Sequence, residues 1–158
     1  MKNIKLKICG MKETENIKEI SALNPDYLGF IFWEKSKRNM TLVSIPELPE
    51  TIKKVGVFVD ASIQEIATKI NQYQLDIIQL HGNESVIFCK NVKKFSVEVI
   101  KVFSIDSTFN FSVVKEYVLA VDYFLFDTKG KLPGGNGITF DWNVLENYHF
   151  SVPYFLSG

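Results

Sequence analysis

The feature that most constrains the fold of this chain is a set of seven short apolar runs, which recur about every 20 to 30 residues. Each run is rich in β-branched and aromatic residues, which is typical of a strand. Strands at this spacing, with helical segments between them, predict right-handed crossovers and a parallel sheet. The runs occupy residues 4–9, 27–32, 54–59, 76–80, 97–102, 123–126 and 153–156.

Helical patterns fill most of the intervals between these runs. In the clearest one, apolar residues spaced three and four apart from Ile63 to Ile70 follow a capping box formed by Ser62 and Glu65. Two prolines within residues 41–51 predict a short or irregular helix there. Other helices are expected over residues 86–95 with Asn83 as the cap, around Val114, Tyr117 and Val118, and behind Thr14 with Ile17 and Ile20.

Two architectures fit this repeat, and the position of the glycines distinguishes them. A doubly wound open sheet would carry a glycine-rich phosphate loop after its first strand, where this chain has only Cys9-Gly10-Met11. The glycine cluster of residues 134–137 instead follows the sixth strand. A late phosphate loop and polar residues after several strands favour an α/β TIM (β/α)8 barrel, whose active site lies at the carboxyl ends of the strands.

A closed barrel of this type has eight strands, whereas residues 1–158 provide seven. We therefore expect residues 1–158 to form one barrel domain that is truncated at its C-terminus. The missing βα elements would belong to a longer polypeptide, in which they are disordered or cleaved, or would come from a partner chain. Otherwise the 158 residues are a fragment.

Charge and composition exclude several functions. The 18 basic and 18 acidic residues balance, so no basic surface indicates nucleic acid and no polybasic cluster indicates a membrane. The longest apolar run, residues 27–33, is far shorter than the roughly 20 residues of a membrane span. With two cysteines and no signal-peptide pattern, the sequence predicts a cytoplasmic protein that binds a small molecule. Its oligomeric state, monomer or homodimer, stays open.

Cys9 ends the first apolar run and precedes Gly10, where a helical segment is expected to follow. A thiolate at that position is stabilised by the helix dipole and by any nearby cation, so Cys9 is a candidate base. The alternative is an inert buried thiol, the usual state of a free cysteine. Cys89 lies inside an amphipathic helical pattern and is expected to serve packing alone.

Further polar residues follow other predicted strands. Asp127 leaves the run of residues 123–126, where burial favours a protonated carboxyl that can act as a general acid, although Asp also commonly caps loops. Arg38 suits bidentate binding of a substrate carboxylate, although most such charge clusters are solvated loops. His81, close to Gln79, is either structural or part of the same site. No second His or Cys completes a metal-ligand pattern.

The glycine-rich segment after the sixth strand is a candidate phosphate loop. Its glycines let backbone amides approach an anion, and the N-terminus of the following helix adds donors. Glycine clusters also form plain turns, so the prediction depends on the position of the segment. The residues expected to bind phosphate are Gly134, Gly135, Asn136, Gly137, Ser157 and Gly158.

Seven motifs stand in order along the chain. They are Lys7-Ile8-Cys9-Gly10, Leu28-Gly29-Phe30-Ile31-Phe32 with Ser36-Lys37-Arg38, Val55-Gly56-Val57-Phe58-Val59, Gln79-Leu80-His81-Gly82, Phe126-Asp127-Thr128, Gly134-Gly135-Asn136-Gly137 with Phe140-Asp141-Trp142, and Leu156-Ser157-Gly158. Together they resemble the phosphoribosylanthranilate isomerase (TrpF) family over essentially the whole chain. The resemblance implies a TIM-barrel isomerase of tryptophan biosynthesis, an aromatic amino acid pathway, that uses no cofactor.

The resemblance also implies a reaction and a role for each candidate. The family converts N-(5-phosphoribosyl)anthranilate to 1-(2-carboxyphenylamino)-1-deoxyribulose 5-phosphate by an Amadori rearrangement. Asp127 would protonate the furanose ring oxygen, and the Cys9 thiolate would remove the C2 proton. Arg38 would hold the anthranilate carboxylate, while His81 and Gln79 would line the sugar site. The glycine loop and Ser157-Gly158 would bind the phosphate.

Two alternatives remain at this point. One is a different phosphosugar isomerase or epimerase on a similar barrel, although such enzymes commonly use paired carboxylates or metals rather than a thiol. The other is a barrel that binds phosphometabolites without turnover, which would not need both Cys9 and Asp127.

Overall fold

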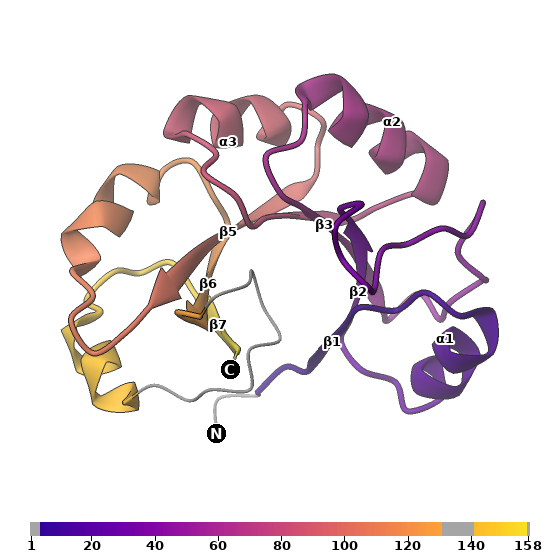
Figure 1. Ribbon diagram of the computed structural model, residues 1–158, viewed down its shortest axis with the longest axis horizontal. Helices are drawn as coiled ribbons and strands as arrows, with labels where there is room; N and C mark the ends of the chain where they lie inside the picture. The colour runs from indigo at the N-terminus through magenta and orange to yellow at the C-terminus, as the bar shows by residue number, and fades with distance from the viewer. Residues whose placement is uncertain (1–3, 131–140, 158) are drawn as a thin grey trace. The chain divides into compact units, whose positions relative to one another are not determined.

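The computed structural model describes residues 4–130 and 141–157, which fall into two compact units. The first unit extends to Gln79 and the second begins at Leu80. Within each unit the paired strands run parallel and follow chain order, as the βα repeat predicted. Seven strands lie in the described residues, close to the seven apolar runs of the sequence (Figure 1).

In the described part of the first unit, strands alternate with two α-helices, and in Figure 1 both helices lie on the same side of the strands. All of β2 is buried, as expected for a parallel strand covered on both faces. The helices contribute Ile17, Ile66 and Tyr73 to the core. The elements are β1 (Lys7–Cys9), α1 (Thr14–Ser21), β2 (Tyr27–Phe32), β3 (Lys53–Phe58), α2 (Ile63–Tyr73) and β4 (Ile77–Leu80), whose last residue opens the second unit.

Among its described residues, the second unit has one α-helix and two short 3-10 helices. None of the helices described in either unit has the length and apolar character needed to cross a membrane. The elements are α3 (Val86–Lys93), β5 (Glu98–Ile105), η1 (Phe111–Tyr117), β6 (Tyr123–Thr128), η2 (Trp142–Asn147) and β7 (Tyr154–Ser157).

At the helix N-termini, the structure confirms one predicted capping residue and corrects another. The Ser62 capping box is confirmed, because the Ser62 hydroxyl accepts a hydrogen bond from the Glu65 amide at 3.1 Å. The cap of α3 was wrong: Ser85, and not Asn83, accepts from the first turn. Both residue types cap well, so local sequence does not separate two candidates this close together. The short or irregular helix predicted for residues 41–51 was also wrong: the segment contains no helix, because its two prolines disfavour even a short one.

An aromatic cluster forms much of the core of the second unit. The ring of Phe111 meets those of Phe126 and Tyr148 edge to face, at centroid distances of 5.4 and 5.7 Å. The Tyr148 ring also meets the Tyr154 ring at 5.0 Å. The pKa of Tyr148 is raised to about 12, mainly because the side chain is buried and to a smaller extent because the Tyr154 phenol lies nearby. The cluster therefore fastens η1 and residue 148 against β6, the strand that carries Asp127.

Truncating the centre of this cluster should destabilise the protein strongly. Phe111 is only 5% exposed, so Phe111→Ala should lower the free energy of unfolding by about 3–5 kcal/mol through lost contacts and the cavity left behind. Phe95, which is 37% exposed, is the matched control, and Phe95→Ala should cost less than about 1 kcal/mol. Urea denaturation measures both values, and equal losses would contradict the assignment of this core.

Candidate active site

Cys9 lies where β1 ends, directly opposite Gly29 of β2. A Cβ atom on residue 29 would come within 2.7 Å of the Cys9 Sγ, so only glycine leaves room for the thiol. The Gly29 carbonyl accepts hydrogen bonds from the amides of Gly10 and Met11, at 2.9 and 3.0 Å. Gly29 thus leaves space for the Cys9 thiol, and its carbonyl accepts the two hydrogen bonds at which the chain leaves β1. The sequence predictions did not assign it this role.

The structure brings Arg38 to the same strand end as Cys9. Its Nη1 donates to the Cys9 carbonyl at 3.1 Å. The side chain passes so close to Gly10 that a Cβ there would lie 2.7 Å from both Cδ and Nη1 of Arg38. Gly10 also has a φ of +94°, which a residue with a side chain rarely adopts. Arg38 is exposed and has five N–H donors, so donors remain for a ligand.

In the second unit, His81 and Asp127 come together although 46 positions separate them in the sequence. The His81 Nε2 lies 3.6 Å from the Asp127 Oδ2, and their side chains are only 11% and 5% exposed. This distance exceeds a good hydrogen bond, and Nε2 has no hydrogen-bond partner among the described residues. The other carboxylate oxygen, Oδ1, accepts from the Thr128 amide at 3.1 Å. The contact leaves Nε2 and Oδ2 able to meet a third group.

Strand register places two serines on either side of Asp127. Ser104 of β5 and Ser157 of β7 are its Cα partners on the neighbouring strands. Paired residues in a parallel sheet project to the same face, so both serines share the face of Asp127. Ser157 was predicted to bind phosphate, whereas Ser104 was not singled out. A serine in a half-buried strand has no distinctive sequence pattern.

Of the remaining predicted site residues, the structure describes Gln79, whereas the glycine loop and Gly158 lie outside the described residues. Gln79 is 3% exposed on β4, and its Oε1 has no hydrogen-bond partner within the described part of the chain. The loop Gly134, Gly135, Asn136 and Gly137, together with Gly158, lies outside the described residues. The phosphate site therefore stays a prediction. Within residues 4–130 and 141–157, no three His, Cys, Asp or Glu side chains group closely enough to hold a metal ion.

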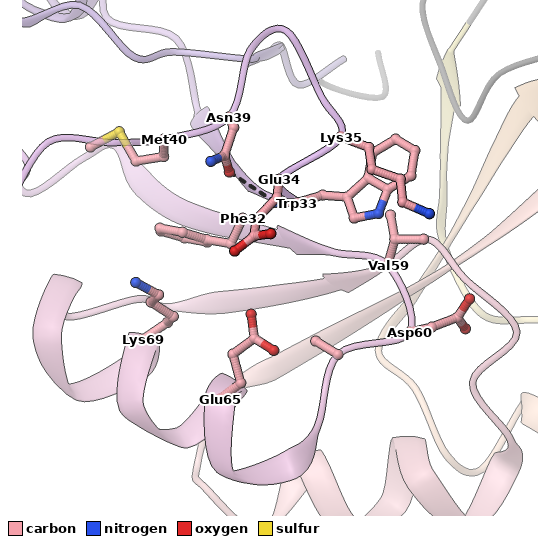
Figure 2. Close-up of a pocket in the computed structure, with 11 residues that line it drawn as sticks. Phe32, Trp33, Glu34, Lys35, Asn39, Met40, Val59, Asp60, Glu65 and Lys69 are labelled. Carbon is pink, nitrogen blue, oxygen red and sulfur yellow. Dashed lines mark hydrogen bonds between the residues drawn. The ribbon is translucent and has the colours of Figure 1, made fainter.

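The first unit also contains a cavity of about 400 Å³ that is separate from Cys9 and Arg38 in its lining (Figure 2). It lies between the turn after β2 and the start of α2, with Glu65 and Lys69 along the helix side. The Lys69 ammonium already stacks over the Phe32 ring at 5.4 Å. The lining residues are Phe32, Trp33, Glu34, Lys35, Asn39, Met40, Val59, Asp60, Ala61, Glu65 and Lys69, none of them a predicted site residue.

The chain is similar to known proteins over nearly its whole length. Residues 6–158 match the family model described as N-(5'phosphoribosyl)anthranilate (PRA) isomerase. A protein of Parabacteroides distasonis with that enzyme name is 42% identical, across 97% of this chain and 72% of its own length. One from Caldanaerobacter subterraneus with the same name is 38% identical, across 98% of this chain and 76% of its own length.

Solved structures of phosphoribosyl anthranilate isomerases share the fold. The protein of Thermotoga maritima superposes with a TM-score of 0.80 at 29% identity, covering 99% of this chain and 78% of its own. That of Thermus thermophilus gives 0.76 at 25% identity, covering 90% and 70%. The predicted α/β fold of the TIM-barrel type is confirmed by these matches. On the family match and the identity to these relatives, the chain belongs to the N-(5'-phosphoribosyl)anthranilate isomerase family.

Proposed function

We propose that this protein converts N-(5'-phosphoribosyl)anthranilate to 1-(2-carboxyphenylamino)-1-deoxyribulose 5-phosphate, an isomerisation in tryptophan biosynthesis. The observation that carries the proposal is the family match over residues 6–158, a range that includes Cys9, Arg38, His81 and Asp127. The reaction needs one acid, one base and close positioning of the substrate, and these residue types supply all three.

Asp127 is the proposed general acid. In its protonated form it gives its proton to the furanose ring oxygen while the C1–O bond breaks, which opens the ring to a Schiff base. The local geometry supports this role, because Oδ1 is held by the Thr128 amide while Oδ2 faces His81 at 3.6 Å. The carboxyl is thus fixed in orientation with one oxygen available to a substrate atom.

Cys9 is the proposed general base. Its thiolate takes the proton from C2 of the Schiff base to give an enolamine, whose tautomerisation yields the ketone. The Arg38 guanidinium donates to the Cys9 carbonyl, which places a positive charge at the strand end that carries the thiol. Gly29 leaves the thiol the space it occupies at the end of β1.

The remaining contacts bind the substrate. Arg38 keeps free donors for the anthranilate carboxylate, and an arginine can hold a carboxylate through two parallel hydrogen bonds. Gln79 and His81 present buried polar atoms without hydrogen-bond partners in the described chain, which suits sugar hydroxyls. The glycine loop of residues 134–137 with Ser157 and Gly158 is proposed to bind the phosphate.

The two cysteines should differ sharply in reactivity. Burial raises the pKa of the Cys89 thiol to about 11, so at pH 8 only about one molecule in a thousand carries the reactive thiolate. Cys9 is half-buried and adjoins a cation. A disulfide reagent such as DTNB should therefore label one thiol quickly in the native protein, with reaction at Cys89 increasing only as the pH rises toward 11. Cys9→Ser is the control, and rapid labelling of that variant would contradict the assignment.

The purified protein should turn over phosphoribosylanthranilate, followed by the decay of substrate fluorescence. Cys9→Ala should lower kcat by several orders of magnitude with little change in KM, because the thiolate acts mainly in the transition state. Cys89→Ala is the matched control and should keep kcat, since that thiol is buried in α3. An active Cys9→Ala variant would remove the thiol from the mechanism. A wild-type protein that binds substrate without turnover would leave only a binding function.

Asp127→Asn should stop ring opening, because the amide keeps the shape of the side chain and loses its acidic proton. We expect kcat to fall by at least about 100-fold, the lower range for loss of a general acid. Asp106→Asn is the control in the same unit, where a half-buried carboxylate bonds Thr108 and Lys129. Steady-state kinetics with pH profiles measure both variants. If Asp127→Asn lost only the alkaline limb of the kcat/KM profile and kept its full height, the acid would lie elsewhere.

A further inference from the structure

A buried charged pair adjoins the segment that carries His81, and the proposed chemistry does not use it. Lys101 on β5 is 3% exposed and Glu84 is 5% exposed. The Lys101 Nζ donates to the Gly82 carbonyl at 2.7 Å, to the Glu84 Oε2 at 3.0 Å and to the Leu80 carbonyl at 3.3 Å. These contacts use all three protons of the ammonium.

Glu84 closes the same network from the other side. Both of its carboxylate oxygens accept from the Gly82 amide, at 3.1 and 3.0 Å. Gly82 is therefore held at its N–H by Glu84 and at its C=O by Lys101. Because the peptide bond between His81 and Gly82 is planar, fixing the Gly82 amide also fixes the carbonyl of His81. The Tyr117 hydroxyl donates to the Glu84 carbonyl at 3.1 Å and anchors the end of this segment.

The pair contacts the His81–Gly82 segment through backbone atoms. In the pairing of β5 with β6, Ser104 is the partner of Asp127, and Lys101 is the partner of Phe124. Successive residues of a strand point to opposite faces, so Lys101 lies on the face away from Asp127. Its ammonium reaches the loop after β4 from the helix-covered side, where Cys89 of α3 is also buried.

Stability alone does not explain why the chain buries these charges. Desolvation of two ions offsets most of their attraction, and apolar residues of similar size often fold as well or better. The geometry points to a different role. We propose that Glu84 and Lys101 are positioning residues, which hold the His81–Gly82 segment so that the His81 imidazole stays against the Asp127 carboxyl. The catalytic consequence rests on the proposed function, whereas the side-chain contact does not.

The contact can be tested without substrate by NMR of the histidine rings. The chain has two histidines, and the exposed His149 serves as an internal reference. In the otherwise wild-type protein, Asp127→Asn should move the His81 ring resonances and leave those of His149 in place. In a Lys101→Met background the same substitution should leave the His81 resonances unchanged, because the ring no longer faces residue 127. An undiminished His81 response in that background overturns the proposal.

Two more variants guard against a trivial loss of folding. Lys101→Met leaves the Glu84 carboxylate buried without its cation, so Lys101→Met/Glu84→Leu removes both charges and should fold where the single variant does not. It should show the same loss of the His81 response, and a retained response there also overturns the proposal. Lys93→Met is the matched control: Lys93 pairs with Asp122 at 2.7 Å in the same unit, and its removal should preserve the response.

Kinetics then test the catalytic consequence. Lys101→Met/Glu84→Leu should lower kcat by about 10- to 100-fold with a small change in KM, the size expected when a group at the site is misplaced by about 1 Å. Lys93→Met should stay within about twofold of the wild type, as a surface pair contributes little. Wild-type kcat in the folded double variant would overturn the positioning role. Absence of turnover in the wild type would overturn the proposed function alone, because the NMR result stands without it.

Discussion

Hydrogen-bonded register between parallel strands is the constraint on which both parts of the candidate site depend. It sets Cys9 opposite Gly29, and the missing side chain of that glycine gives the thiol its space. It also sets Asp127 between Ser104 and Ser157 on one face of the second unit's sheet. A shift of one residue would turn Asp127 toward the helices and bring Phe126 into its place. The chemistry proposed for this family member therefore depends on backbone pairing before any side-chain contact.

Near these positions the chain buries polar atoms at a cost to its stability. The His81 Nε2 and the Gln79 Oε1 are buried without hydrogen-bond partners in the described residues. Each such group costs roughly 1–3 kcal/mol. In the second unit, the edge-to-face rings around Phe111 and Tyr148 supply apolar burial against the strand that carries Asp127. A rigid apolar layer beneath an incompletely bonded polar face is the arrangement that a preorganised binding site requires.

The Glu84–Lys101 pair shows how the two faces of a strand can cooperate. One face of β5 contributes Ser104 beside Asp127, and the other sends an ammonium to the loop that carries His81. The hydrogen bonds of a charged pair in this position fix the orientation of one peptide group. Apolar side chains of similar size would fill the same space without fixing that orientation. A lysine inside an otherwise apolar strand pattern was visible in the sequence. Its partner was not, since 17 positions separate the two residues.

The sequence by itself determined the strand positions, their parallel order and the residues most suited to acid and base chemistry, because apolar periodicity and residue type are local properties. It also indicated that Cys9, Arg38, His81 and Asp127 each end or follow a predicted strand. Only the tertiary structure decided that Gly29 seats the thiol, that Ser85 and not Asn83 caps α3, and that Lys101 holds the His81 segment from the opposite face. The Gly29 and Lys101 features arise from distances between residues remote in the chain, which register and packing set and which no local pattern records. The cap of α3 is a choice between two suitable residue types two positions apart, which residue type alone does not make.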